Sequence, residues 1–316
     1  MDKFKIFIIG LGNIGLLYDL ILPKNYVLSH TRAFHISNNF EILGVIDNNL
    51  KHKDFFKNYY AYPYFNSIDE AFKNFNPDGI IISTPPETHL DIISSVIKFK
   101  SISFIVCEKP FTNSLENSIK ANKLCIKNKI KLFVNYQRNS SIITRQLLSD
   151  LNNNVIKGPI KINHWYSDGL ENSCSHFISL FNQLFGEINN ISMFNKKKSC
   201  TDKKEFVLEY ENAEIVFRNL SYPYVFNGFK LFASNGILEY LNNGIEVNWY
   251  GLMDSKVNYP KKKIIGKKNI YHKNDFFTSQ KSFTVELFKT LTNQNSYIST
   301  GHDAIYVRNI INKLII

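Results

Sequence analysis

Continuous apolar segments recur through the first part of the chain, with amphipathic segments between them. They are KIFIIG (5–10), FEILGVID (40–47), GIIIS (79–83), ISFIVCE (102–108) and IKLFVNY (130–136). Apolar runs without alternation are typical of parallel strands that are buried on both faces. Between them, Ser67 and Glu70 form a capping box that opens an amphipathic helix. We therefore predict a doubly wound parallel sheet, a Rossmann-type α/β domain, over residues 1–136.

The pattern changes after residue 136. One amphipathic segment, SSIITRQLLSDL (140–151), is followed by a region rich in strand patterns. Two hairpins are indicated, one over 205–220 that turns near Glu211 and Asn212, and one over 237–250 that turns around Asn242 to Gly244. We predict a second, α+β domain over residues 137–316, with a large and mostly antiparallel sheet.

A formal net charge of +11 raises the question of nucleic-acid binding. The densest basic tract, PKKKIIGKKN (260–269), is bounded by a proline and contains a glycine, which favours a solvated loop over a recognition surface. We expect no nucleic-acid partner. A positive field would attract a phosphorylated or nucleotide-linked substrate.

The cysteines indicate the compartment. None of the four has the paired spacing of a disulfide framework or a zinc site; they are Cys107, Cys125, Cys174 and Cys200. Glycines interrupt the N-terminal apolar stretch, and Asp19 lies near its end, which argues against a signal peptide. No other stretch is apolar for long enough to span a bilayer. We expect a cytoplasmic protein with no metal site and no membrane partner.

Three glycines, Gly10, Gly12 and Gly15, follow the first apolar run directly. Such glycines allow a tight turn, a close approach of the backbone to a pyrophosphate and close packing of a following helix on the strand. We predict that this loop, with Asn13 and Ile14, opens a helix and binds a dinucleotide.

Asp47 ends the second apolar run, where a carboxylate can accept hydrogen bonds from an adenosine ribose. The gap from Gly15 to Asp47 exceeds the usual distance of about 20 residues, which we attribute to an inserted loop around 22–30. A simple strand-to-helix turn with a surface aspartate remains the alternative. Because a carboxylate repels a 2′-phosphate, NAD is favoured over NADP.

Three further motifs, STPPETH (83–89), CEKP (107–110) and NYQR (135–138), resemble the Gfo/Idh/MocA family of glucose-fructose oxidoreductase and inositol dehydrogenase. The segments 166–187, 234–244 and 300–314 are similar to the second domain of that family. The resemblance implies a Rossmann domain, bound NAD or NADP, and hydride transfer at a sugar hydroxyl. Sheets of this kind pair between subunits in relatives, which implies a homodimer or homotetramer.

The resemblance also assigns residues of the cofactor side. Lys109 matches the catalytic lysine between nicotinamide and substrate, where an ammonium stabilises the alkoxide that develops as hydride leaves. Glu108 adjoins it as scaffold beside the cofactor, and the Lys109–Pro110 bond is expected to be cis. Thr84, Pro85 and His89 flank the nicotinamide side of the nucleotide.

On the substrate side, His176 matches a histidine that exchanges a proton with the substrate hydroxyl. The family's inositol-type members carry aspartate four residues before and three residues after this histidine, where the chain has Asn172 and Ser179. Further substrate contacts are expected from three residues, namely Arg138, Tyr166 and Asp168.

Two explanations account for the missing carboxylates. The chain is similar to family members from surface-polysaccharide gene clusters, which act on sugars that are often nucleotide-linked. In that case Asn172 positions His176 by hydrogen bonding. Alternatively, the chain is a catalytically silent NAD-binding sensor or regulatory protein of the same fold. Retention of Lys109 and His176 favours the enzyme.

Overall fold

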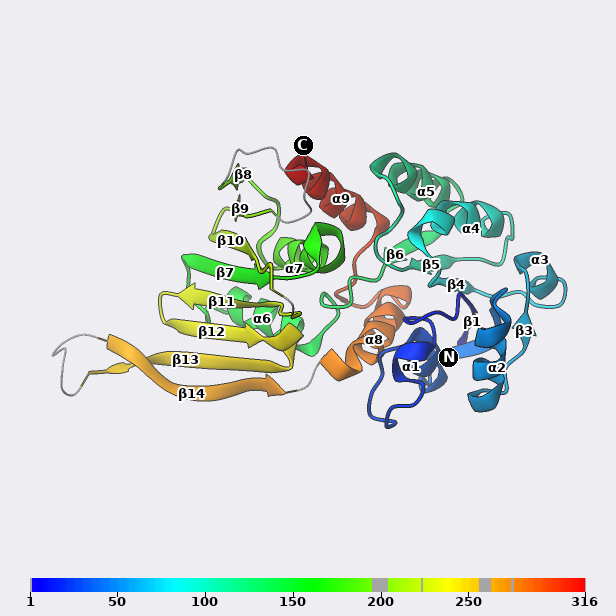
Figure 1. Ribbon diagram of the computed structural model, residues 1–316, viewed down its shortest axis with the longest axis horizontal. Helices are drawn as coiled ribbons and strands as arrows, with labels where there is room; N and C mark the ends of the chain where they lie inside the picture. Colours follow the sequence, from blue (N-terminus) through cyan, green and yellow to red (C-terminus); the bar gives the residue numbers. More distant parts are fainter. Residues whose placement is uncertain (1, 195–203, 223, 256–262, 274–275, 316) are drawn as a thin grey trace. The chain divides into compact units, whose positions relative to one another are not determined.

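The structure is a computed structural model that describes residues 2–194, 204–222, 224–255, 263–273 and 276–315. The chain divides into two compact units (Figure 1), one formed by residues 1–140 and 277–309 and the other by residues 141–276 and 310–316. The return of residues 277–309 to the first unit has no signature in the sequence pattern. In the described part of the chain, no helix has both the length and the apolar character needed to cross a membrane.

The first unit contains a parallel sheet whose strands, in the described residues, follow the order β3-β2-β1-β4-β5-β6. Its strands are β1 (Phe4–Ile9), β2 (Phe40–Ile46), β3 (Tyr64–Phe65), β4 (Gly79–Ile82), β5 (Phe104–Cys107) and β6 (Lys131–Val134). This order confirms the predicted doubly wound fold. The five apolar runs each supply a strand, whereas β3 is too short to leave a pattern.

Helices cover both faces of this sheet, which is why its strands are continuously apolar. The helices are α1 (His30–His35), α2 (Leu50–Tyr59), α3 (Ile68–Ala71), α4 (His89–Val96), α5 (Leu115–Lys127), α8 (Ser279–Leu291) and most of α9 (Gly301–Ile315). On one face, Ile6 and Ile8 belong to a core with Phe34 of α1 and Phe283 of α8. On the other face, the ring of Phe7 packs against phenylalanines that follow β2 and α3, namely Phe65, Phe72 and Phe75.

The segment after β1 differs from our expectation, because no α-helix begins at the glycine-rich loop. Residues 12–16 form a single turn, which continues directly into a short 3-10 helix at Leu17–Asp19. The chain then makes an excursion before α1 begins at His30. The backbone N–H groups of His30 and Thr31 donate to the carbonyls of Ile14 and Gly15, at 2.9 and 3.0 Å. Helix α1 therefore continues the turn of the glycine-rich loop through space, and the insertion runs from about residue 17, earlier than expected.

Asp19 organises this insertion. Its carboxylate is fully buried and accepts hydrogen bonds from the backbone N–H groups of Leu28 and Ser29 and from the Ser29 hydroxyl, at 2.6 to 2.9 Å. Ser29 in turn caps α1 by accepting from the N–H of Arg32. The insertion thus ends at the N-cap of α1, and the first residue of that helix, His30, is buried.

The second unit contains a sheet whose strands, in its described residues, follow the order β14-β13-β12-β11-β7-β10-β9-β8. These strands are β7 (Ile160–Tyr166), β8 (Asn190–Met193), β9 (Phe206–Glu209), β10 (Ala213–Asn219), β11 (Gly228–Ala233), β12 (Gly236–Leu241), β13 (Glu246–Asp254) and β14 (Lys263–Lys273). Both predicted hairpins are present, as β9–β10 and β12–β13. Apart from the parallel β7–β10 pair, the pairs are antiparallel, as predicted.

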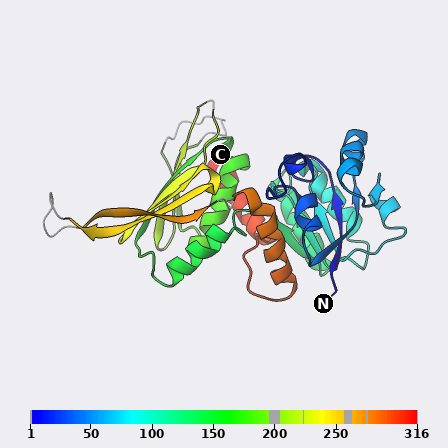
Figure 2. The ribbon, with the colours of Figure 1, turned by 90° about the horizontal axis from the view of Figure 1, so that it is seen from below.

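One face of this second sheet is covered by helices, which are α6 (Ile142–Asn152) and α7 (Ser175–Phe185) (Figure 2). Phe181 of α7 packs on Phe217 and Phe229, with ring centroids 5.8 and 5.3 Å apart. The alternate positions of β7, such as Lys161 and Asn163, are exposed.

We expected the lysine-rich tract 260–269 to be a solvated loop, but part of it forms a strand. Its described residues, 263–269, belong to β14 and pair with β13. Lys263 Nζ lies 2.6 Å from Asp254 Oδ1 across that pair. Residues 260–262 of the tract, like Cys200, lie outside the described residues.

Candidate active site and cofactor pocket

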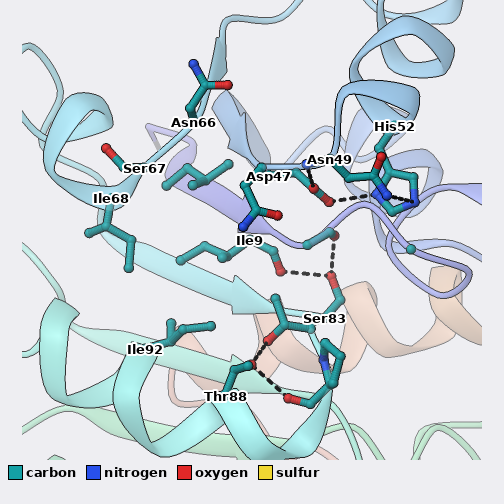
Figure 3. Close-up of a pocket in the computed structure, with 16 residues that line it drawn as sticks. Ile9, Asp47, Asn49, His52, Asn66, Ser67, Ile68, Ser83, Thr88 and Ile92 are labelled. Atoms are coloured by element: carbon teal, nitrogen blue, oxygen red, sulfur yellow. Dashed lines mark hydrogen bonds and ion pairs between the residues drawn. The ribbon is translucent and has the colours of Figure 1, made fainter.

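A cavity of about 570 Å³ lies in the first unit at the carboxyl ends of β1, β2 and β4. Ligands of open α/β sheets bind at this edge. Its lining comprises Ile9, Gly10 and Gly12 around the end of β1, residues 46–49 and His52 around the end of β2, residues 66–68, and Ser83, Thr84, Pro85, Thr88 and Ile92 after β4 (Figure 3).

The three glycine positions differ in how much space a side chain would have there. Gly10 has φ +94°, and a Cβ there would lie 2.8 Å from Thr84 Cγ2. A Cβ on Gly15 would lie 2.2 Å from the carbonyl oxygen of Gly10. A Cβ on Gly12, by contrast, would meet no protein atom within 4 Å, although Gly12 lines the cavity. The packing of the protein does not require a glycine at position 12, and the open space beside it fits the close approach of a pyrophosphate.

Asp47 lies at the end of β2, as predicted, and its carboxylate faces the glycine-rich loop. Oδ2 accepts from the backbone N–H of Leu11 at 2.6 Å, and Oδ1 accepts from that of Asn49 at 2.7 Å. His52 Nδ1 lies 3.0 Å from Oδ2 (Figure 3). An ionised carboxylate offers about four acceptor positions. One on Oδ1 therefore remains for a ribose hydroxyl.

Residues after β4 build the floor of the cavity. The Ser83 hydroxyl donates to the carbonyl of Gly10 at 2.7 Å, and the hydroxyls of Thr84 and Thr88 lie 2.7 Å apart (Figure 3). His89 is fully buried, outside the cavity lining, with its two ring nitrogens 2.8 and 2.9 Å from the carbonyls of Thr84 and Phe111. It ties together the loops that follow β4 and β5 and so places Thr84 and Pro85.

Glu108 and Lys109 follow β5, and the Lys109–Pro110 bond is cis, as expected. Glu108 Oε1 lies 2.6 Å from His30 Nε2 and accepts from Asn135 Nδ2, also at 2.6 Å. Burial raises the pKa of Glu108, but the hydrogen bonds and charge of His30, the hydrogen bond from Asn135 and the charge of Lys109 outweigh it, so the pKa lies below its ordinary value. Glu108 is therefore a buried anion directly beside Lys109.

His30 is a site residue that sequence reasoning missed. An ionised carboxylate accepts hydrogen bonds and donates none, so Nε2 of His30 must carry the hydrogen that Glu108 accepts. Its side chain has no exposed surface. Because an insertion separates His30 from the glycine-rich loop, its sequence position gave no hint that it reaches the end of β5.

The candidate substrate-binding residues differ in the unit to which they belong and in their burial. Arg138 belongs to the first unit and is 8% exposed. In the second unit, His176 is buried at the start of α7, just after a π-helical turn at Leu170–Cys174, while Asn172 in that turn is exposed. π-Helical turns occur frequently at functional sites.

The segment before this turn is also distinctive. Asp168 is exposed with φ +60°, and Gly169 follows with φ +76°. Aspartate adopts this left-handed conformation more readily than most residues, so the two positions form a turn before the π-helical segment. Tyr166, in contrast, has no exposed surface, and its hydroxyl donates to the backbone carbonyl of Lys204. This placement gives Tyr166 a role in packing rather than on the sugar-binding surface that we expected.

The fold and the cavity define a class of protein, one with a Rossmann domain of the dinucleotide-binding type. Residues 4–136 match the model of the oxidoreductase family with an NAD-binding Rossmann fold, GFO_IDH_MocA. The match confirms the resemblance inferred from the motifs over these residues, and with it an NAD-binding Rossmann fold.

Among the curated proteins, no significant match to the sequence is found. Solved structures share the fold over nearly the whole chain. The WlbA dehydrogenase from Bordetella pertussis, in complex with NADH and UDP-GlcNAcA, has 14% identity and a TM-score of 0.70, covering 99% of this chain and 94% of that one. The UDP-N-acetylglucosamine 3-dehydrogenase GnnA from Acidithiobacillus ferrooxidans has 14% identity and a TM-score of 0.72, covering 99% and 97%. A super-repressor mutant of Gal80p from Saccharomyces cerevisiae has 12% identity and a TM-score of 0.74, covering 99% and 95%.

Proposed function

We propose that the chain is an NAD-dependent oxidoreductase that transfers a hydride between the nicotinamide and a hydroxyl or keto group of a sugar. One observation carries the proposal. The cofactor cavity, with Asp47 and the open space beside Gly12, is formed by the same sheet edge at which Lys109 follows the buried anion Glu108 after β5.

The residues have separate roles in this reaction. Bound NAD supplies the carbon that accepts the hydride. The ammonium of Lys109 donates a hydrogen bond to the reacting oxygen and stabilises its negative charge as the hydride leaves. Glu108, which stays ionised, favours the charged form of Lys109. His176 takes up the hydroxyl proton as general base, with Asn172 as its positioning partner.

A nucleotide-linked sugar from surface-polysaccharide biosynthesis is the substrate we propose. The net charge of +11 favours an anionic substrate. WlbA, which has this fold, was solved with NADH and UDP-GlcNAcA, and GnnA is a UDP-N-acetylglucosamine 3-dehydrogenase. Arg138 and Asp168 are the proposed contacts to phosphate and to sugar hydroxyls.

A catalytically silent regulator is the second candidate, because Asn172 and Ser179 stand where inositol-type relatives have carboxylates. Gal80p, whose super-repressor form shares the fold, provides a precedent for a regulatory protein. Such a protein would bind NAD without turnover.

The deciding experiment combines NAD titration calorimetry with a panel of UDP-linked and free sugars followed by NADH absorbance. For Lys109→Met we expect NAD affinity within about threefold of wild type and kcat lowered by about 100-fold or more, because the stem remains while the charge is lost. Lys98→Met, an exposed lysine paired with Asp69, is the matched control and should retain activity. Full activity of Lys109→Met refutes the site, and tight NAD binding without turnover of any sugar by the wild type supports the regulator.

A second experiment tests His176. Asn172→Asp places an acid four residues before the histidine and should move the acidic limb of the kcat/KM profile upward, since a nearby anion favours the protonated imidazole. His176→Ala should remove the limb. A profile unchanged by Asn172→Asp would show that the two side chains do not interact.

Exposed apolar side chains of the second sheet, among them Phe232, Leu252 and Ile265, favour self-association as a homodimer or homotetramer. Light scattering after size-exclusion chromatography tests this, and a monomer at micromolar concentration would contradict it.

A further inference from the structure

His52 lies beside Asp47 in the cofactor cavity. Of the described residues that line the cavity, these two are the ones that ionise. Nδ1 of His52 lies 3.0 Å from Asp47 Oδ2, and the histidine side chain is 21% exposed against 9% for the aspartate. Asn49, the N-cap of α2, accepts from the N–H of Lys51 and holds the first turn that carries His52. The pair is thus positioned by the helix start and faces the cavity (Figure 3).

Other charges near the pair lie outside the cavity lining. On α2, Lys53 Nζ lies over the ring of Tyr64, 5.3 Å from its centroid. Burial and the charges of Asp47 and Asp54 raise the pKa of Tyr64 to about 12, so this neighbour on β3 is uncharged at neutral pH. Helix α2 also carries Lys51, Asp54 and Lys57, and Glu70 on α3 accepts from the N–H of Asn66, which lines the cavity.

The ribose-binding aspartate is the group that rejects NADP, because its negative charge meets the 2′-phosphate. A charged imidazole at 3.0 Å would cancel most of that field. Histidine is the side chain whose charge changes between about pH 5 and 8. The charge that a 2′-phosphate would meet is therefore the sum of the charges of Asp47 and His52, and in this pH range it is the charge of His52 that can change.

We propose that His52 sets the discrimination between NAD and NADP: uncharged, it leaves the charge of Asp47 to reject the 2′-phosphate, and protonated, it neutralises that charge and admits NADP. The inference rests on the proposed role of NAD and extends it. NAD affinity should change less than NADP affinity, since the ribose hydroxyl of NAD is neutral and keeps its hydrogen bond to the Asp47 carboxylate in both states of His52.

The test is titration calorimetry of NAD and of NADP at about pH 6 and about pH 8. For the wild type, the ratio of the two dissociation constants should move toward NADP at the lower pH. The 2′-phosphate itself takes up a proton near pH 6 and also shifts the ratio. His52→Asn therefore provides the baseline, because the amide keeps a donor for Asp47 and does not titrate. We expect the shift of the wild type to exceed that of His52→Asn by about fivefold.

Two further variants complete the test. His52→Arg carries a permanent charge and should raise NADP affinity at about pH 8 by about fivefold or more. His35→Asn, which alters an exposed histidine that contacts Tyr62 outside the cavity, should behave as wild type. Equal shifts in wild type and His52→Asn, or no gain for His52→Arg, overturn the inference while leaving the NAD assignment intact. A wild type that binds neither cofactor overturns the proposed function and the inference together.

Discussion

Two carboxylate–histidine pairs lie at the same edge of the parallel sheet, yet their surroundings differ. Glu108 and His30 are 2.6 Å apart, with side-chain exposures of 9% and 0%. Asp47 and His52 are 3.0 Å apart, and the histidine is 21% exposed. The first pair is closed off by protein, with Asn135 as a further donor, whereas the second borders the cofactor cavity.

The difference in burial suits the two carboxylate–histidine pairs to different roles. A buried anion must keep every donor it has, because removing one leaves the charge unpaired in a poorly solvated interior. A pair at a cavity wall can exchange a partner for solvent or ligand at small cost. We therefore assign the pair of Glu108 and His30 to the framework of Lys109, the proposed catalytic residue, and the pair of Asp47 and His52 to recognition of the cofactor.

The largest expected effect comes from breaking the buried pair. His30→Ala should lower the free energy of unfolding by about 3 to 5 kcal/mol, because Glu108 keeps its charge and loses its histidine partner at 2.6 Å. Urea denaturation followed by circular dichroism measures this change. His35→Ala, an exposed histidine of the same helix, is the control and should cost about 0.5 kcal/mol or less. A loss below about 1 kcal/mol for His30→Ala would contradict the framework role.

The second effect concerns NAD affinity. Asp47→Ala should weaken NAD binding by about tenfold or more, since a hydrogen bond to a charged group contributes about 1.5 to 3 kcal/mol. Glu108→Gln should weaken it much less, because Glu108 lies outside the cavity lining. Calorimetric titration of both folded variants decides the point. Equal losses would mean that the two carboxylates share one role.

The third effect is a pH dependence. The pKa of Glu108 is lowered in the folded protein, so the stabilisation is complete above its unfolded value of about 4.3 and is lost as the pH falls toward the folded value. Between about pH 5 and pH 3, the wild type should therefore lose more free energy of unfolding than Glu108→Gln, which has no such group to protonate. If the urea midpoints of the two proteins changed with pH by the same amount over this range, the lowered pKa of Glu108 would be refuted.

The smallest effect is expected from the second histidine. His52→Ala should change the free energy of unfolding by about 1 kcal/mol or less, because partly exposed ion pairs contribute little. The same urea measurement, made beside His30→Ala, shows whether the two pairs differ as proposed. A cost for His52→Ala that equals the cost for His30→Ala would remove the distinction.

Much of the fold could be predicted because the sheet of the first unit is buried on both faces. Each of its long strands leaves a continuous apolar run, and the two hairpins of the second sheet leave alternating runs around polar turns. Strand β3 pairs through two residues and leaves no pattern. The lysine tract was misjudged, since a strand with exposed residues can carry charges that read as a loop.

The candidate site was predictable where a residue follows a strand directly. Gly10, Gly12 and Asp47 line the cavity for that reason. His30 and His52 were missed, because their positions depend on an insertion and on a helix start that the sequence pattern does not locate. We expected Tyr166 to contact the sugar, but it lies on the buried face of β7. Alternation along a strand shows that one face is buried, but not which face the helices cover.

The helix after the glycine-rich loop shows that a secondary structure element need not be covalently continuous. Its first turn and α1 are joined by hydrogen bonds from His30 and Thr31 to Ile14 and Gly15, while residues 17–29 leave and return between them. The two ends of that excursion therefore lie about one helical turn apart. Residues 17–29 therefore interrupt the chain but not the helix, and they are anchored in the same unit by Asp19, by Leu20 in the core and by Val27, which exchanges backbone hydrogen bonds with Phe277 and Gln280.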